Sequence, residues 1–215
     1  MQIAKTNMIE SQLKPEGINC AKTIDCISQI NREDFIPEKY MNLSYSEYDV
    51  PLYGNYSMLR PVMIGKILQS LKIKKTDRVL EVGTGSGYLT CCLSMMGHSV
   101  DTVDINKNMI QRAKKIHSSY NIHNINYLNK DIYSNWIPEK NYDAIIITGS
   151  IVSRIKKLEN LLNLDGKMFV VIGKNPVMTA NIISRVSTDK VICRQLFETL
   201  IEPLENINER KDLIF

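Results

Sequence analysis

A glycine-rich stretch that directly follows a β-rich run constrains the fold of this chain more than any other feature. Residues 78–90 read RVLEVGTGSGYLT, in which Gly83, Gly85 and Gly87 alternate with a threonine and a serine. Glycines at this spacing remove the side chains that would keep a ligand away from the backbone. In an open α/β sheet, ligands bind beyond the carboxyl ends of the strands, where this loop is expected to lie.

Strand and helix patterns alternate along the chain from residue 78 onward. Strands are expected at 78–82, 99–103, 125–128, 142–148 and 168–172, and helices from Tyr88 to Gly97, at 106–119 and at 152–163. The fourth strand, YDAIIIT, contains the continuous apolar run of a strand buried on both faces. This order predicts an α/β fold with a doubly wound, mostly parallel sheet of the Rossmann type. Two later segments, 179–187 and 190–200, are expected to form either two further strands or a strand and a helix.

The first 60 residues differ in character from the rest and are expected to cap the α/β core within a single domain. Asn19 is the expected N-cap of a helix over 20–30, and a second helix is expected over 58–71. Between these helices, tyrosines mix with prolines and other turn residues, which favours irregular structure over an independent domain. We therefore assign residues 1–60 to the cap and the substrate side, and 61–215 to the cofactor-binding core.

The composition indicates a globular protein and excludes several partners. The chain has 215 residues, 44% of them hydrophobic, and a net charge of +4, and its short basic runs contain no interleaved aromatics. Nucleic acid is therefore not an expected partner. Five cysteines without a Cys-x-x-Cys pair and three histidines without zinc-ligand spacing predict reduced thiols and no metal site. A polar N-terminus and the lack of a membrane-spanning run predict a cytoplasmic protein without a membrane partner, with a monomer favoured.

Acidic residues accompany the glycine loop in an order that suits an adenosine ligand. Glu81 lies two positions before the first glycine, Asp104 ends the second strand, and Asp131 follows the third. A carboxylate at the second of these places can accept both hydroxyls of a ribose. A dinucleotide would require Gly-x-Gly-x-x-Gly and would be repelled by the acid before the loop. S-adenosylmethionine, with its sulfonium and amino groups, fits these residues better than NAD.

The segment LEVGTGSGY resembles the first motif of the protein-L-isoaspartate O-methyltransferases, which belong to the S-adenosylmethionine-dependent methyltransferases. The likeness extends upstream to REDFIPEKYMNLSYSEYDVPL and MLRPVMIGKILQSL, and downstream to YDAIIITGS, LLNLDGKMFVVIG and LFETLIEPL. It implies methyl esterification of isoaspartyl residues in damaged proteins or peptides. The residues expected to contact the cofactor are Glu81, Gly83, Thr84, Gly85, Ser86, Gly87, Asp104, Ile105, Asp131, Ile132 and Thr148.

The chain departs from the resembled family in its substrate segment. The family carries Thr-Ile-Ser before the proline that matches Pro61, whereas this chain has Ser57, Met58 and Leu59. The family's substrate-side serine therefore falls on Leu59, and Ser57 is the remaining hydroxyl and the candidate catalytic residue. An isoaspartyl carboxylate is ionised at neutral pH, so no general base is expected. Tyr40–Pro61 is expected to cover the active site.

Three other functions remain compatible with these residues. A related methyltransferase could act on another acceptor, such as a small molecule, because Leu59 cannot form a hydrogen bond with its side chain. The chain could also bind the nucleoside without catalysis or, as a more distant alternative, act as a nicotinamide oxidoreductase. Methylation of nucleobase amines is disfavoured, because Thr148-Gly149-Ser150-Ile151 stands where an Asp/Asn-Pro-Pro-aromatic signature would be expected.

Overall fold

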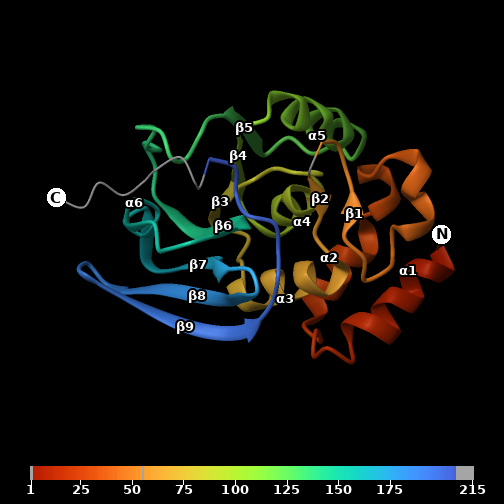
Figure 1. Cartoon of the computed structure of the whole chain (residues 1–215), viewed down its shortest axis with the longest axis horizontal. Coiled ribbons are helices and arrows are strands. Elements are labelled where there is room, and N and C mark those ends of the chain that lie inside the picture. The colour runs from red at the N-terminus through yellow and green to blue at the C-terminus, as the bar shows by residue number, and fades with distance from the viewer. Residues whose placement is uncertain (1, 55, 207–215) are drawn as a thin grey trace.

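Within residues 2–54 and 56–206, which the computed structural model describes, seven strands form one central sheet (Figure 1). The strands are β3 (Arg78–Val82), β4 (Ser99–Asp104), β5 (Ile125–Asn129), β6 (Tyr142–Ile151), β7 (Leu162–Lys174), β8 (Val177–Ser187) and β9 (Lys190–Glu198). Their order in the sheet is β5-β4-β3-β6-β7-β8-β9. The chain thus reverses direction across the sheet between β3 and β6, which makes their carboxyl ends the switch point of the fold.

The sheet is mostly parallel, as the alternating pattern predicted. Strands β5, β4, β3, β6 and β7 pair in parallel, whereas β8 and β9 add an antiparallel hairpin to the far edge. The hairpin resolves the alternative left open for the tail, which forms two strands. The expected α/β fold class with a Rossmann-like sheet is therefore confirmed.

Two apolar clusters cover the two faces of the sheet. Successive side chains of a strand point to opposite faces, so Val79 packs toward one cluster and Leu80 toward the other. The first face is covered by three helices: α3 (Pro61–Leu71), α4 (Tyr88–Met96) and α5 (Lys107–Ser119). The second face is covered by the one-turn helix α6 (Lys156–Glu159) and by connecting loops.

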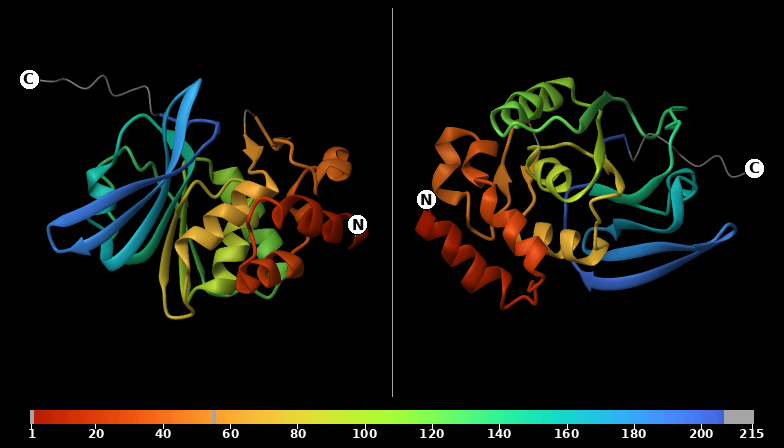
Figure 2. Two further views of the ribbon diagram at one scale, coloured as in Figure 1. Left: turned by 90° about the horizontal axis from the view of Figure 1, so that it is seen from below. Right: turned by 180° about the vertical axis from the view of Figure 1, so that it is seen from behind.

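The N-terminal segment packs beside α3 and α4. Its elements are α1 (Gln2–Met8), a π-helix (Ile9–Leu13), α2 (Ala21–Gln29), two 3-10 helices (Arg32–Phe35 and Glu38–Leu43) and the short hairpin of β1 (Val50–Pro51) and β2 (Ser57–Met58). Leu13 and Phe35 are fully buried in the same apolar cluster as Ile64 of α3 and Leu89 of α4. Figure 2 shows this segment at one end of the molecule and the β8–β9 hairpin at the other.

Two expectations for the helical boundaries were wrong. The N-cap of α2 is Cys20 rather than Asn19, and no side chain caps this helix. The amide oxygen of Gln69, in α3, instead accepts the backbone N–H groups of Asn19 and Cys20, at 3.0 and 2.9 Å. The helix expected from residue 58 begins at Pro61, because Met58 pairs with β1 and Arg60 is the N-cap in an extended conformation.

The prediction of a helix over 152–163 was also wrong, because only the single turn of α6 forms there. Strand β6 continues to Ile151, and β7 already begins at Leu162, which pairs with Tyr142. Pairing with the sheet thus takes the C-terminal end of the predicted helix, and the residues between Ile151 and α6 form an irregular turn.

Candidate active site

A cavity of about 680 Å³, here called the main cavity, opens at the carboxyl ends of β3, β4 and β6. It lies at the switch point, where an open α/β sheet binds its ligand. The predicted site residues that line it are Ser57, Glu81, Gly83, Thr84, Gly85, Ser86, Asp104, Ile105, Asp131, Ile132 and Thr148. The structure thus brings together residues from the hairpin before α3 and from the ends of the four neighbouring strands β5, β4, β3 and β6.

Gly83 begins the glycine loop and is held against β6. Its φ of +96° belongs to the left-handed region, and a Cβ atom here would collide with the hydroxyl of Thr148. That hydroxyl donates to the carbonyl oxygens of Val82 and Gly83, at 3.0 and 2.8 Å. Thr148 therefore fixes the end of β3, and only glycine fits beside it.

Glu81 is fully buried beneath the loop. Its Oε2 accepts hydrogen bonds from the hydroxyls of Thr90 and Thr102, at 2.5 and 2.7 Å, while Oε1 has no partner among the described residues. Burial raises the pKa of this carboxyl to about 8, and the nearby charge of Asp104 adds to the effect. A cationic group in the main cavity would lower that pKa again and would favour the carboxylate.

Asp104 is held by the backbone at the end of β4. Its two oxygens accept the N–H groups of Asn106 at 2.8 Å and of Gly85 at 3.1 Å, and it is 7% exposed. Burial raises the pKa of this carboxyl, although both hydrogen bonds act in the opposite direction. The carboxylate is thus oriented by the glycine loop on one side and by the start of α5 on the other.

Asp131 is held in a similar way after β5. One of its oxygens accepts the N–H of Tyr133 at 2.7 Å, and the other accepts the side-chain amide of Asn206 at 3.1 Å. Ile132 beside it is buried, whereas Ile105 after β4 is 38% exposed at the rim. The two acids and the two isoleucines all line the main cavity, just after the neighbouring strands β4 and β5.

These features fit S-adenosylmethionine. A glycine loop lets the ligand approach the backbone, two oriented acids suit a ribose and an adenine, and the unpartnered Oε1 of Glu81 suits a cationic amino-acid end. Within the described part of the chain, no three His, Cys, Asp or Glu side chains gather to hold a metal ion. In the same residues, no helix has the length and apolar character needed to cross a membrane.

A buried arginine supports the segment that is expected to face the substrate, and it was missed by the sequence analysis. Arg32 is 1% exposed; it donates to the carbonyl oxygen of Ser44 at 2.7 Å and to that of Leu59 at 2.9 Å. Its guanidinium carbon lies 4.9 Å from the centre of the Tyr88 ring, and burial lowers its pKa. An arginine within a polar leader reads as a surface residue, so the sequence carried no signal for this role.

The C-terminal segment, residues 200–206, forms one wall of the main cavity and was also missed. The N–H of Ser150 donates to the carbonyl of Glu202 at 2.9 Å, and the N–H of Leu204 donates to the carbonyl of Ser150 at 3.0 Å. A Cβ atom at Gly149 would lie 2.9 Å from the backbone nitrogen of Leu204, so the segment crosses very close to the end of β6. Only the likeness of LFETLIEPL pointed to this region.

Comparison with known proteins decides the family. The model of the protein-L-isoaspartate(D-aspartate) O-methyltransferase family matches residues 4–208. The chain belongs to this family. A protein-L-isoaspartate O-methyltransferase of Proteus mirabilis is 30% identical over 179 residues, which cover 83% of this chain and 86% of the relative. One from Petrotoga mobilis is 29% identical over 180 residues, covering 83% and 84%.

A solved structure shares the fold. It comes from Plasmodium falciparum and is described as a protein-L-isoaspartate O-methyltransferase in complex with S-adenosyl-L-homocysteine. It superimposes with a TM-score of 0.81 at 22% identity, covering 94% of this chain and 97% of that one. The family, the enzyme class and the S-adenosylmethionine cofactor expected from the sequence motifs are thereby confirmed.

Gly87 is the one predicted site residue that does not line the main cavity of this methyltransferase. It has a φ of +85°, and a Cβ atom there would lie 2.7 Å from the Cβ of Ala113 and 3.0 Å from Nε2 of His117. A glycine is therefore needed at this position for the close packing of α4 against α5. The carbonyl oxygen of Gly87 lies 2.8 Å from the same Nε2, and the hydroxyl of Tyr127 lies 2.7 Å from Nδ1.

We expect His117 to make the methyltransferase less stable in mild acid. The carbonyl of Gly87 accepts from Nε2–H, so Nδ1 accepts the Tyr127 hydroxyl, and the neutral ring satisfies both partners. Burial lowers the pKa of His117 below its usual 6.5. The unfolded chain therefore binds the proton more readily, and the stability present above pH 6.5 falls as the pH drops, by at most about 1.4 kcal/mol per pH unit.

Urea unfolding at pH 7.5 and 5.5 measures this loss. His117→Gln should reduce the difference between the two pH values, and His123→Gln, at an exposed histidine, should leave it unchanged. An identical pH dependence in the wild type and His117→Gln would show that the folded and unfolded chains protonate this imidazole equally, so that burial does not lower its pKa.

Proposed function

We propose that this methyltransferase transfers the methyl group of S-adenosylmethionine to isoaspartyl carboxylates in damaged proteins or peptides. The observation that carries the proposal is one cavity lined by the glycine loop and its acids on one side and by the substrate segment Ser57–Leu59 on the other. The cofactor contacts predicted for these residues and the candidate role of Ser57 are part of the proposal.

This reaction requires the acceptor carboxylate to be aligned with the methyl group of the cofactor, and it requires no proton transfer. S-adenosylmethionine supplies an electrophilic methyl group on its sulfonium. The acceptor carboxylate, with a pKa near ~4, is ionised at neutral pH and needs no general base. The residues of the chain therefore bind both partners, orient them and keep water out. The wall formed by residues 200–206 serves the last task, because it closes the side of the main cavity beside Gly149.

Each of three acids around the glycine loop would contact a different part of the cofactor. Asp104 would accept the ribose hydroxyls, since the backbone already orients its carboxylate. Glu81 would face the cationic end of the ligand with its unpartnered oxygen. Asp131 would lie beside the adenine, where a single contact is expected to be weaker than two contacts to the ribose.

On the acceptor side, Leu59 occupies the position where the family pattern has a serine. The carbonyl of Leu59 is already bound by Arg32, and its side chain offers no hydrogen bond. Ser57 lines the main cavity, and its hydroxyl is the candidate that replaces the missing serine. A weak contact to the acceptor also keeps a second candidate function open, in which the same cofactor methylates a small molecule.

Methylation of an isoaspartyl peptide, compared with its normal aspartyl isomer, tests the proposal. We expect a methyl ester on the isoaspartyl peptide alone, formed slowly by the wild type. A hydroxyl that contacts a charged group contributes about 1.5–3 kcal/mol, so Leu59→Ser should raise the rate about 10- to 150-fold. Ser57→Ala should lower it.

Two results would count against this substrate. Cofactor binding without methylation of either isomer, in both the wild type and Leu59→Ser, would favour the small-molecule acceptor. Strong activity that is unaffected by Ser57→Ala would show that neither hydroxyl recognises the carboxylate.

We further propose that the enzyme is a single domain, with residues 1–60 as its cap, and that it acts in the cytoplasm as a monomer without nucleic acid. The cap shares one apolar cluster with α3 and α4, which supports a single unit. The five cysteines of the chain form no disulfide, which suits a reducing compartment. Size-exclusion chromatography with light scattering tests the monomer.

A further inference from the structure

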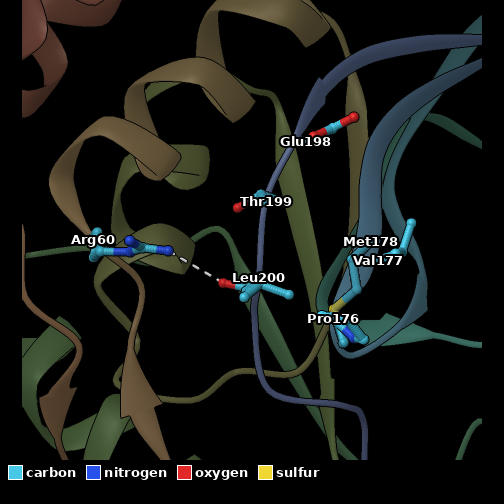
Figure 3. Close-up of a pocket in the computed structure, with 7 residues that line it drawn as sticks. All are labelled: Arg60, Pro176, Val177, Met178, Glu198, Thr199 and Leu200. Carbon is cyan, nitrogen blue, oxygen red and sulfur yellow. Dashed lines mark hydrogen bonds between the residues drawn. The ribbon is translucent and has the colours of Figure 1, made fainter.

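A second cavity, of about 490 Å³, lies between the start of α3 and the β8–β9 hairpin (Figure 3). We call it the Arg60 pocket. It is lined by Arg60, Pro176, Val177, Met178, Glu198, Thr199 and Leu200. Met178 and Leu200 also line the main cavity, so the two cavities adjoin. Leu59 lines the main cavity and is followed by Arg60, which places the Arg60 pocket next to the substrate segment.

We propose that the Arg60 pocket binds the side chain of a residue adjacent to the isoaspartyl residue and prefers lysine or arginine there. The inference rests on the proposed function. An isoaspartyl residue within a protein continues into further residues, so its chain must leave the main cavity through an opening. A small-molecule acceptor would need no such second cavity.

The charges around the Arg60 pocket leave one group uncompensated. Arg60 is paired with Asp49 at 3.3 Å and donates to the carbonyl of Leu200 at 3.2 Å, the contact drawn in Figure 3. Glu198 has no ion-pair partner among the residues that the structure describes. Among the residues that line the pocket, the uncompensated charge is therefore negative, and a negative charge favours a cationic side chain.

The rest of the pocket suits the stem of a long cationic side chain. Val177 is 71% exposed and Leu200 is 47% exposed, and together with Met178 they offer an apolar surface beside Glu198. Lysine and arginine bury their methylene groups on such a surface while the charged end remains in water. Figure 3 shows Val177 and Met178 on the β8 side of the pocket, across from Arg60.

Peptides that differ in one residue test the proposal. Isoaspartyl hexapeptides are synthesised with Lys, Ala or Glu immediately before or immediately after the isoaspartyl residue. Binding is measured by fluorescence anisotropy in the presence of S-adenosylhomocysteine, and methylation is measured separately. We expect tighter binding of the Lys peptide than of the Glu peptide on one side, by about two- to fivefold, which is the usual effect of one solvent-exposed ion pair.

Variants of Glu198 decide whether this residue is the cause. Glu198→Gln should abolish the preference, and Glu198→Lys should reverse it in favour of the Glu peptide. Asp189→Asn, at the exposed turn between β8 and β9, removes the same charge elsewhere and should leave the preference intact.

Equal affinity for the Lys and Glu peptides on both sides would overturn the proposal, as would a preference that survives in Glu198→Lys. Because binding is read independently of turnover, a charge preference without methylation would contradict the proposed function but not the Arg60 pocket.

Discussion

Replacing Gly83 with alanine is expected to destabilise the folded enzyme by about 3 kcal/mol or more and to abolish cofactor binding. Two effects add in this variant. The φ of +96° is unfavourable for any residue with a Cβ atom, at about 1–2 kcal/mol. The new Cβ atom would also collide with the hydroxyl of Thr148, and overpacking of this kind costs about 1–3 kcal/mol.

A double-mutant cycle separates the collision from the backbone strain. Thr148→Ala removes the hydroxyl, and the remaining Cβ of residue 148 would lie 3.5 Å from a Cβ at residue 83, an ordinary contact. We therefore expect Gly83→Ala/Thr148→Ala to be more stable than the sum of the single variants implies, with a coupling energy of about 1–3 kcal/mol. Denaturant unfolding of the four proteins measures it.

Gly17→Ala provides the matched control for the strain alone. Gly17 has a φ of +80°, and no atom lies within 4 Å of the Cβ position there, so this variant should lose only about 1–2 kcal/mol. Additive effects of Gly83→Ala and Thr148→Ala would mean that the glycine loop can shift away from β6, contrary to the close fit found here.

The parts of the fold that the sequence predicted are those determined by local patterns. Strand β6 was recognised because it contains the uninterrupted apolar run 144–147, which is typical of a strand buried on both faces. The glycine loop and Asp104 were predicted to lie together because a nucleoside site requires particular residue types at fixed spacing, and both line the main cavity. Each of these signals lies within a few residues of the chain.

The parts that could not be predicted depend on distant segments. Nothing near Arg32 in the sequence reveals that its charge is buried between the carbonyls of Ser44 and Leu59. Gly87 obeys the motif, yet its surroundings are set by α5, 20 or more positions further along the chain. The wall of residues 200–206 is fixed by backbone hydrogen bonds to Ser150, and such bonds carry no side-chain signature.

Asp104→Ala is expected to weaken the binding of S-adenosylhomocysteine by about 5- to 150-fold, the loss typical of charge-assisted hydrogen bonds worth about 1–3 kcal/mol. Titration calorimetry measures this change, with NAD as a ligand that should not bind either protein. Asp131→Ala should have a smaller effect, because it removes one contact to the adenine rather than two to the ribose. Unchanged affinity in Asp104→Ala would reduce this acid to a structural residue at the end of β4.

A structural role must be separated from a direct one, since Asp104 also accepts the N–H groups of Gly85 and Asn106. Asp104→Ala could therefore disturb the loop without any contact between this acid and the ligand. A 2′-deoxy analogue of S-adenosylhomocysteine distinguishes the two cases. If the carboxylate binds the ribose hydroxyl, the wild type should lose affinity for the analogue, whereas Asp104→Ala should bind both ligands equally. If the variant only distorts the loop, removal of the ribose hydroxyl should lower the affinity of both proteins for the ligand by the same factor.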